Sequence, residues 1–174
     1  MRKFFVGVDN GLDGAVVVID EAENVVLKFV MPVTKAKKGR VFDVFELAKT
    51  LHTDLIMGYG NDDVYVGIEK AQVFPISGKR SCFMTGFAYG MIQGIFAALG
   101  LGYELITPKS WQKSIFEGLN QDDTKVASVL FCKRKWPDTE WRATVKSRKE
   151  HDGLTDAACI ALYLKRKHNE SKTA

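Results

Sequence analysis

Residues 3–18, KFFVGVDNGLDGAVVV, decide the fold of this chain. The first half is β-branched and aromatic, which predicts a buried strand, and residues 15–19 predict a second strand. Gly11 and Gly14 flank the connection and can adopt the positive φ angles of a tight turn, so we expect an antiparallel hairpin. Asp9 then lies at the mouth of the hairpin. A carboxylate there is solvated, hydrogen-bonded or bound to a cation, unless it is only a turn residue.

Composition limits the class of protein. The chain has 174 residues, 46% of them hydrophobic, so we expect a single domain over residues 1–174, with a short flexible tail from about residue 169. The three cysteines lie far apart without C-x-x-C spacing, which argues against a zinc site and a secreted disulfide framework. The N-terminus shows no targeting pattern, so we expect a cytoplasmic location, in the host if a phage encodes the chain.

The coarse order of elements predicts an α/β fold. A third strand at 24–31 completes an antiparallel meander, and a basic loop at 34–40 leads to a helix at 41–55. A fourth strand at 64–69 ends on Glu69, as the first ends on Asp9. Strand 103–107 is the fifth of a mixed sheet covered by helices. Acids at strand ends indicate a site, because open α/β sheets bind ligands at that edge.

The stretch 82–101 contains no charge and is long enough to span a bilayer. Gln93, the repeated glycines and the polar segment that follows favour a helix of a soluble protein without membrane contact. Gly86, Gly90 and Gly94 are four residues apart, so they line one helix face and permit close approach of a sheet or a partner helix.

The C-terminal half predicts three helices. One begins at Pro108, with Thr107 as N-cap and Trp111 on its apolar face, and a second is opened by residues 122–123. The last, at about 150–167, carries Asp152 and Asp156 one turn apart on the same face.

Basic residues cluster between positions 133 and 149, where Trp136 and Trp141 are interleaved with them. A charge run is usually a solvated face, but solvated faces do not need tryptophan, so this mixture favours a surface for a polyanion. The residues that we expect to contact DNA are Lys35, Lys37, Lys38, Arg40, Lys79, Arg80, Lys109, Arg142, Lys146 and Arg148.

Four acids from separate elements indicate a metal site. Each alone is explained as a turn residue, a helix cap or a surface acid, but together they repel one another unless a cation lies between them. Oxygen ligands without a thiolate or histidine cluster suit Mg²⁺ or Mn²⁺. Two such ions stabilise the attacking and leaving oxygens of phosphodiester cleavage, so we expect a metal-dependent nuclease.

The motifs in order resemble a known family. They are VGVDNGLDGAV, VGIEKAQVF, TPKSWQK, DDTK and HDGLTDAACIALY, and they cover nearly the whole chain. This set is similar to RuvC-type Holliday junction resolvases of the RNase H-like fold. The four-residue spacing of the last two acids, with Gly153 between them, is similar to the phage and poxvirus-like branches.

The resemblance implies roles for particular residues. It implies that Asp9, Glu69, Asp152 and Asp156 form the metal site and that Phe74 pushes at bases of the junction. The changed spacing of the last acids leaves His151 open as an alternative ligand or base. The resemblance also implies a homodimer across the uncharged helix, and the residues that we expect at the dimer interface are Phe83, Gly86, Phe87, Gly90 and Gly94.

Three other functions are consistent with parts of the sequence. The D-x-G hairpin also resembles the phosphate loop of actin-like sugar kinases and ATPases, but the chain is short for two lobes, so we expect no nucleotide cofactor. A nucleic-acid binding module without activity would not need all the acids. A less selective RNase H-like nuclease, acting on flaps, branched DNA or hybrids, would have the same fold.

Overall fold

The computed structural model describes residues 2–37, 39–59, 64–72, 76, 78–118 and 124–173. The strands are β1 (Phe4–Asp9), β2 (Ala15–Asp20), β3 (Val25–Val30), β4 (Val33–Lys35), β5 (Arg40–Phe42), β6 (Val64–Glu69) and β7 (Tyr103–Ile106). The helices are α1 (Val44–Thr50), the π-helical η1 (Leu51–Ile56), α2 (Met57–Tyr59), α3 (Lys79–Ala98), α4 (Pro108–Ile115), α5 (Thr124–Lys135) and α6 (Asp152–Thr173).

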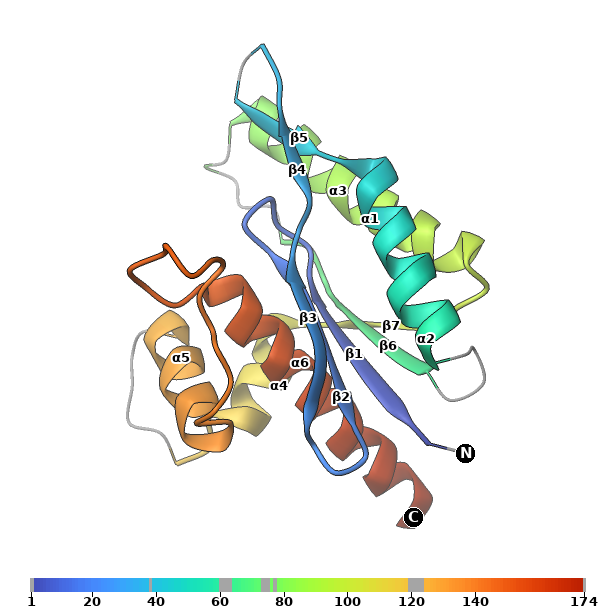
Figure 1. Cartoon of the computed structure of the whole chain (residues 1–174), viewed down its shortest axis with the longest axis vertical. Helices are drawn as coiled ribbons and strands as arrows, with labels where there is room; N and C mark the ends of the chain where they lie inside the picture. Colours follow the sequence, from blue (N-terminus) through green and yellow to red (C-terminus); the bar gives the residue numbers. More distant parts are fainter. Residues whose placement is uncertain are drawn as a thin grey trace.

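A five-stranded mixed sheet forms the centre, in the order β3-β2-β1-β6-β7. The pairs β1–β2 and β2–β3 are antiparallel, whereas β1–β6 and β6–β7 are parallel. Helices cover both faces: α4, α5 and α6 lie on one, and α1, α2 and α3 lie on the other (Figure 1). The predicted fold class and the antiparallel meander are therefore confirmed.

Each face of the sheet has its own apolar core, as a sheet between two helical layers requires. Alternate residues of β1 and β2 point to opposite faces, so Phe5 belongs to the α6 side whereas Phe4 belongs to the α3 side. Trp136 and Trp141 are buried in the core on the α6 side, and Trp141 is only 2% exposed. The prediction that these tryptophans form part of a surface is wrong, because their rings fill the space beneath α5 and α6.

The helix α6 crosses β1 with almost no space between them. A Cβ atom on Gly7 would lie 2.0 Å from the carbonyl oxygen of Ala157 and 2.5 Å from the amide nitrogen of Ala161. Only glycine permits this approach, because every other side chain would enter the backbone of α6. The small residues of the facing helix and Gly7 thus bring the start of α6 to the edge of the sheet.

Several boundaries differ from the sequence prediction. The expected basic loop at 34–40 forms the hairpin β4–β5, in which Gly39 adopts a φ of 89° at the turn. This hairpin, called the arm below, projects from the sheet (Figure 1). The predicted helix 41–55 begins only at Val44, where Asp43 caps its first turn. The last helix runs to Thr173 instead of ending near residue 167.

The glycines of the first hairpin act differently from the prediction. Neither Gly11 nor Gly14 adopts a positive φ. Gly14 is instead required for space, since a Cβ atom there would lie 2.1 Å from the carbonyl oxygen of Asp9. The hairpin therefore closes tightly over the carboxyl end of β1.

The helix α3, which is uncharged from Ser81 onward, is, within the described residues, the one helix long and apolar enough to cross a membrane. Its inward side, formed by Ala88, Ile92 and Phe96, packs in the core on that face of the sheet. The glycine face, which was expected to meet a sheet or a partner helix, does not contact the sheet, because Cβ atoms on Gly86, Gly90 and Gly94 would meet nothing within 4 Å.

Candidate active site

Two of the predicted acids lie at neighbouring strand ends. The parallel strands β1 and β6 pair as far as Val8 and Ile68, and the next residues are Asp9 and Glu69. Both carboxylates therefore lie at the carboxyl edge of the sheet, which is where the sequence places them. The backbone N–H of Gly11 donates a hydrogen bond to Oδ1 of Asp9 at 3.4 Å.

The other two acids reach this edge because α6 begins there. Asp152 is the first residue of α6, and Asp156 follows one turn later. The intervening Gly153 lies directly under the hairpin turn, where a Cβ atom would be 2.3 Å from the carbonyl oxygen of Asp13. Glycine at this position is needed for the hairpin and the start of α6 to come together. The four acids are called the acid cluster below.

The electrostatics show that the acids interact. The pKa of Asp9 is raised to about 8, first by burial and then by the nearby charges of Glu69, Asp156 and, more weakly, Asp152. The hydrogen bond from Gly11 lowers this pKa but does not compensate. All three of the predicted partners of Asp9 thus contribute to the repulsion that it experiences.

Glu69 has two contacts that sequence reasoning missed. The indole nitrogen Nε1 of Trp111 donates a hydrogen bond to Oε1 of Glu69 at 2.8 Å, and the side-chain amide of Asn10 donates to the backbone carbonyl of Glu69. Burial raises the pKa of Glu69, and the hydrogen bond from Trp111 opposes that rise. One signal was available, because Trp111 stands in the first turn of a helix that follows a strand next to that of Glu69.

His151 precedes α6 and caps it. Its ring nitrogen Nδ1 accepts a hydrogen bond from the backbone N–H of Leu154 at 3.3 Å, and its carbonyl oxygen accepts from the same N–H at 3.0 Å. Capping gives His151 a structural role beside Asp152. Its predicted role as a ligand or base stays a prediction.

The donor set of the acid cluster is that of a hard divalent cation. In the described part of the chain, no group of three or more His, Cys, Asp or Glu side chains is arranged so that it could hold a metal ion. Carboxylates of like charge repel and do not converge tightly by themselves. A proton on Asp9 relieves part of this repulsion, and a cation would relieve more of it. The chemistry of the residues therefore fits Mg²⁺ or Mn²⁺.

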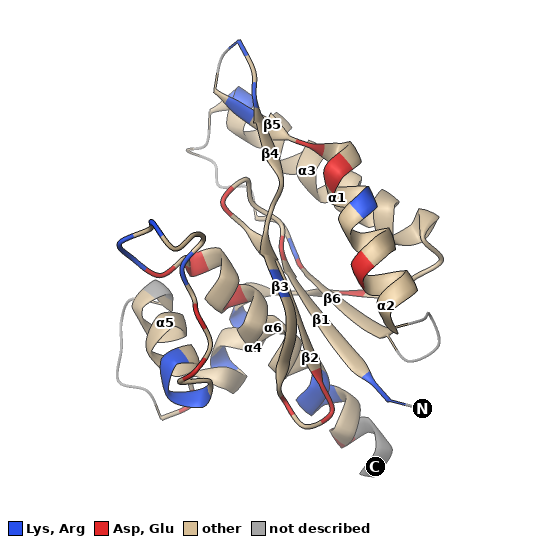
Figure 2. Ribbon diagram, viewed as in Figure 1, with Lys and Arg blue, Asp and Glu red and all other residues tan. Residues whose placement is uncertain are grey.

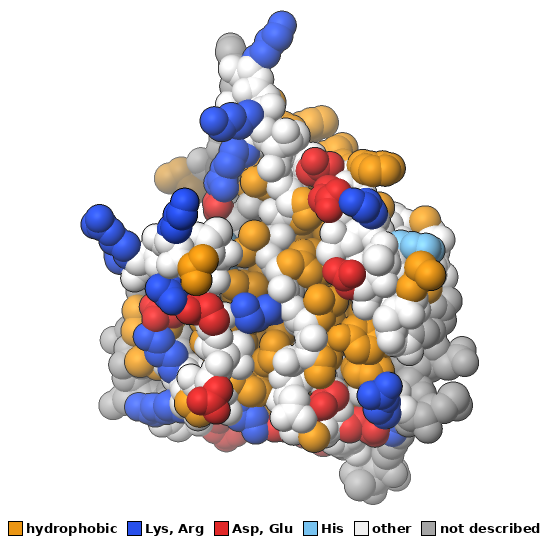
Figure 3. Space-filling view, in the orientation of Figure 1, with side chains coloured by type: hydrophobic (Ala, Val, Ile, Leu, Met, Phe, Trp, Pro, Cys, Tyr) orange, Lys and Arg blue, Asp and Glu red, His pale blue; other side chains and the backbone are white. Residues whose placement is uncertain are grey.

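Most of the described residues that are predicted to bind DNA lie in two groups beside the acid cluster. Lys35, Lys37 and Arg40 are exposed on the arm, and basic residues of the loop 136–151 form the second group. Figure 2 shows Lys and Arg positions in blue on the ribbon of the arm and of this loop, and Figure 3 shows blue side chains in the same region of the molecule. Lys38 and Phe74 lie outside the described residues. Lys79 and Arg80 begin α3, and Lys109 is exposed on α4.

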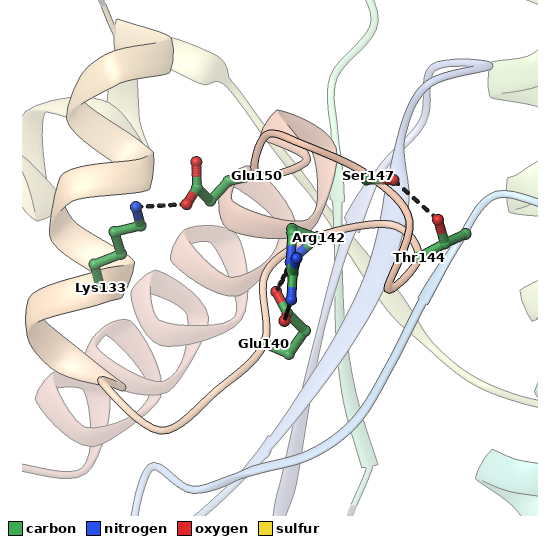
Figure 4. A network of polar contacts seen from close by, with 6 residues as sticks. All are labelled: Lys133, Glu140, Arg142, Thr144, Ser147 and Glu150. Atoms are coloured by element: carbon green, nitrogen blue, oxygen red, sulfur yellow. Dashed lines mark hydrogen bonds and ion pairs between the residues drawn. The ribbon is translucent and has the colours of Figure 1, made fainter.

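Two of these cations, Arg40 and Arg142, form ion pairs with acidic side chains. Arg40 pairs with Asp13 in the first hairpin at 2.8 Å, and Arg142 pairs with Glu140. Figure 4 shows the pair Arg142–Glu140, the ion pair between Lys133 and Glu150, and the hydrogen bond between Thr144 and Ser147. These contacts order the loop 136–151, which delivers the chain to the start of α6.

The residues predicted at a dimer interface share the outer face of α3. Cβ atoms built on Gly86, Gly90 and Gly94 meet nothing within 4 Å. Phe83 and Phe87 are 70% and 46% exposed, and their rings stack with centroids 6.4 Å apart. This apolar surface is therefore open in the single chain.

Comparison with known proteins places this geometry in a fold family. No protein-family model and no curated protein matches the chain. A structure of T. thermophilus RuvC in complex with a Holliday junction substrate is 14% identical, with a TM-score of 0.57 over 92% of this chain and 91% of that one. The chain has the fold of the RuvC-type resolvases. A second T. thermophilus RuvC structure is 16% identical, with a TM-score of 0.59 over 97% and 96% of the two chains.

The RuvC-type fold also includes a mitochondrial protein. The yeast mitochondrial Holliday junction resolvase Ydc2 is 15% identical, with a TM-score of 0.64 over 97% of this chain and 80% of that one. At these identities the likeness establishes the fold alone. The phage or poxvirus-like branch stays a prediction.

Proposed function

We propose that this chain is a metal-dependent, structure-selective DNA endonuclease that resolves four-way junctions by paired hydrolysis on opposing strands. The observation that carries the proposal is the pKa of Asp9 at one edge of a RuvC-type fold, which burial and the nearby charges of Glu69, Asp156 and Asp152 raise to about 8. Such a rise costs folding free energy, and perturbed carboxylates of this kind are typical of functional sites. A purely structural module has no use for this arrangement.

The roles of the acids follow from their places. Asp9, whose pKa responds to the charges of the other three acids, would hold two divalent ions together with Glu69, Asp152 and Asp156. Bound Mg²⁺ would neutralise charge on the scissile phosphate and lower the pKa of an attacking water. The chain itself presents the acids from three separate elements and, through Gly7 and Gly153, fixes their separation. His151 holds the start of α6 in place through its cap.

The arm and the loop 136–151 would hold the DNA phosphates. Their exposed cations stand on two elements, one linked to the first hairpin by the Arg40–Asp13 ion pair and the other leading directly into Asp152, so a DNA duplex that reaches the acid cluster would pass close to both. On binding DNA, Arg40 would leave its ion pair with Asp13 and form one with a phosphate instead. Release of counterions from DNA makes such binding fall steeply with salt concentration.

The proposed unit is a homodimer on the outer face of α3. A four-way junction has approximate two-fold symmetry, and two matched cuts with one site per chain require two chains. The open face of Gly86, Gly90 and Gly94, with two exposed phenylalanines, is an uncharged surface that a second copy would cover. We expect Gly90→Leu to weaken dimerisation in sedimentation and to replace paired cuts by single nicks. A wild-type protein that sediments as a monomer, free and on a junction, contradicts the dimer.

The test of the function is cleavage of a synthetic four-way junction beside linear duplex, a flap and an RNA–DNA hybrid, each with Mg²⁺, with Mn²⁺ and with EDTA. We expect symmetric cuts in the junction only when metal is present. Equal cutting of flaps or hybrids would instead support the less selective nuclease. Junction binding without any cleavage would support the silent binding module, and binding of ATP in calorimetry would support the kinase-like alternative.

A further inference from the structure

We propose that Trp111 is a positioning residue of this site, whose indole N–H holds one oxygen of Glu69 so that the other is presented to a divalent cation. The inference rests on the proposed metal-dependent function. Trp111 is a core side chain on α4, and Glu69 is a proposed metal ligand at the end of β6. The two residues are 42 positions apart in the chain, and Nε1 of Trp111 lies 2.8 Å from Oε1 of Glu69.

The indole is held firmly in place. Trp111 is 1% exposed, lies in the core on the α6 side and packs edge-on against Phe116, with ring centroids 5.4 Å apart. A fully buried ring in a packed core keeps one rotamer, so the direction of its N–H is fixed before any ligand binds. Trp111 therefore acts as a fixed donor toward Glu69.

The start of α4 explains why the donor points at Glu69. Glu69 pairs with Ile106 in the register of β6 and β7, and the N–H of Lys70 donates to the carbonyl of Ile106 at 2.7 Å. Thr107 then caps α4, its hydroxyl accepting from the N–H of Ser110. The chain therefore turns into a helix beside the end of β6, and the first turn of that helix carries Trp111 back toward Glu69.

Indole suits this task better than other donors. It has a single N–H and cannot accept a hydrogen bond, so it neither competes for the cation nor exchanges roles with the carboxylate. It carries no charge, whereas a lysine or arginine would cancel the charge that the cation needs. One carboxylate oxygen is thus occupied and the second remains a ligand. This is the arrangement by which hydrogen bonds from outside a metal shell orient its ligands.

The experiment compares Trp111→Phe with Trp136→Phe. Trp136 is also a buried tryptophan whose Nε1 donates a hydrogen bond, in this case to the backbone carbonyl of Glu23, away from the acid cluster. Both variants lose an indole N–H and part of a ring from the same core. Mn²⁺ affinity is measured by calorimetry without DNA, together with the thermal midpoint without metal and the Mn²⁺ concentration for half-maximal junction cleavage.

We expect Trp111→Phe to weaken Mn²⁺ binding by about 10–100-fold, the usual effect of losing such an outer hydrogen bond. The two variants should lower the thermal midpoint of the metal-free protein by similar amounts. Trp136→Phe, however, should leave Mn²⁺ affinity within twofold of wild type. If Trp111→Phe does not fold, benzothienylalanine at position 111 replaces the N–H by sulfur with the same bicyclic shape, and it should show the same loss of affinity.

Three results overturn the proposal: Mn²⁺ affinity of Trp111→Phe within twofold of wild type, the same for the benzothienyl variant, or an equal loss of affinity in Trp136→Phe. Failure of the proposed function looks different, because wild-type protein would then neither bind Mn²⁺ nor cut junctions. Wild-type cleavage with an unaffected Trp111→Phe variant refutes only the role of Trp111.

Discussion

Two regions of α6 shift the pKa values of nearby acidic residues in opposite directions. At its first turn, Asp152 and Asp156 approach two further carboxylates, and repulsion together with burial raises the pKa of Asp9 to about 8. Further along, Lys165 reaches Glu23 at 2.6 Å, and Lys135 of α5 pairs with the same carboxylate. Burial alone would raise the pKa of Glu23, but the two lysines outweigh it and lower that pKa.

This contrast separates stability from function within one helix. Glu23 lies in the turn between β2 and β3, and its ion pairs fasten α5 and α6 to that end of the sheet. The acid cluster at the other end costs free energy in the absence of a cation, and no packing requirement explains it. Proteins keep such unfavourable clusters where a ligand compensates for them. The comparison therefore supports the proposal that the acid cluster is the functional site.

Outside the four acids, the largest effect is expected from Gly153→Ala. Its Cβ atom would lie 2.3 Å from a backbone oxygen of the first hairpin, so the hairpin and the start of α6 must separate. Junction cleavage should fall by about 100-fold or more, since a displacement of about 1 Å costs that much in a catalytic site. Gly58→Ala is the control, because a Cβ atom there meets nothing within 4 Å. Cleavage by Gly153→Ala within threefold of the control would refute this account of the close contact.

A second effect concerns pH. Below its raised pKa of about 8, Asp9 holds a proton in the metal-free protein, and a cation must displace it. Mn²⁺ affinity should therefore rise about tenfold per pH unit between pH 6 and pH 8 and level off above that range. Calorimetry in two buffers of different ionisation enthalpy measures both the affinity and the proton released. An affinity that is constant from pH 6 to pH 8 would show that Asp9 is already ionised.

The smallest effect is expected from Glu23→Gln, which removes both ion pairs at the other end of α6. Because the site is partly solvated, the loss should be only about 0.5–1 kcal/mol of unfolding free energy at pH 7. A lowered pKa stabilises the folded state above the unfolded value of 4.5, and the benefit disappears as the pH falls through the folded value. Urea titrations of variant and wild type should thus converge in acid, while junction cleavage is unchanged. A variant that loses cleavage would mean that both ends of α6 serve the site.

The sequence predicted the sheet and the acid cluster because both depend on local patterns. Apolar runs that end on Asp9 and Glu69, and two acids one turn apart, are visible without any knowledge of long-range packing. The contacts of Trp111 and Trp136 could not be predicted in this way, since they depend on which of the two apolar cores each ring packs in. The basic segment 34–40 looked like a loop because its charges hid the β-branched ends, Val33 with Thr34 and Val41, that pair as the arm.

The central claim is that the acid cluster lowers the free energy of unfolding and is kept because it is needed for metal-dependent cleavage. The variant Asp9→Asn tests this claim most directly. At pH 8, junction cleavage with Mg²⁺ and the free energy of unfolding in EDTA are measured on the same preparation. The account predicts that cleavage disappears while junction binding is retained, and that the free energy of unfolding rises by roughly 1–3 kcal/mol because one buried, repelled charge is gone. Cleavage within tenfold of wild type, or a variant less stable than wild type, would contradict it.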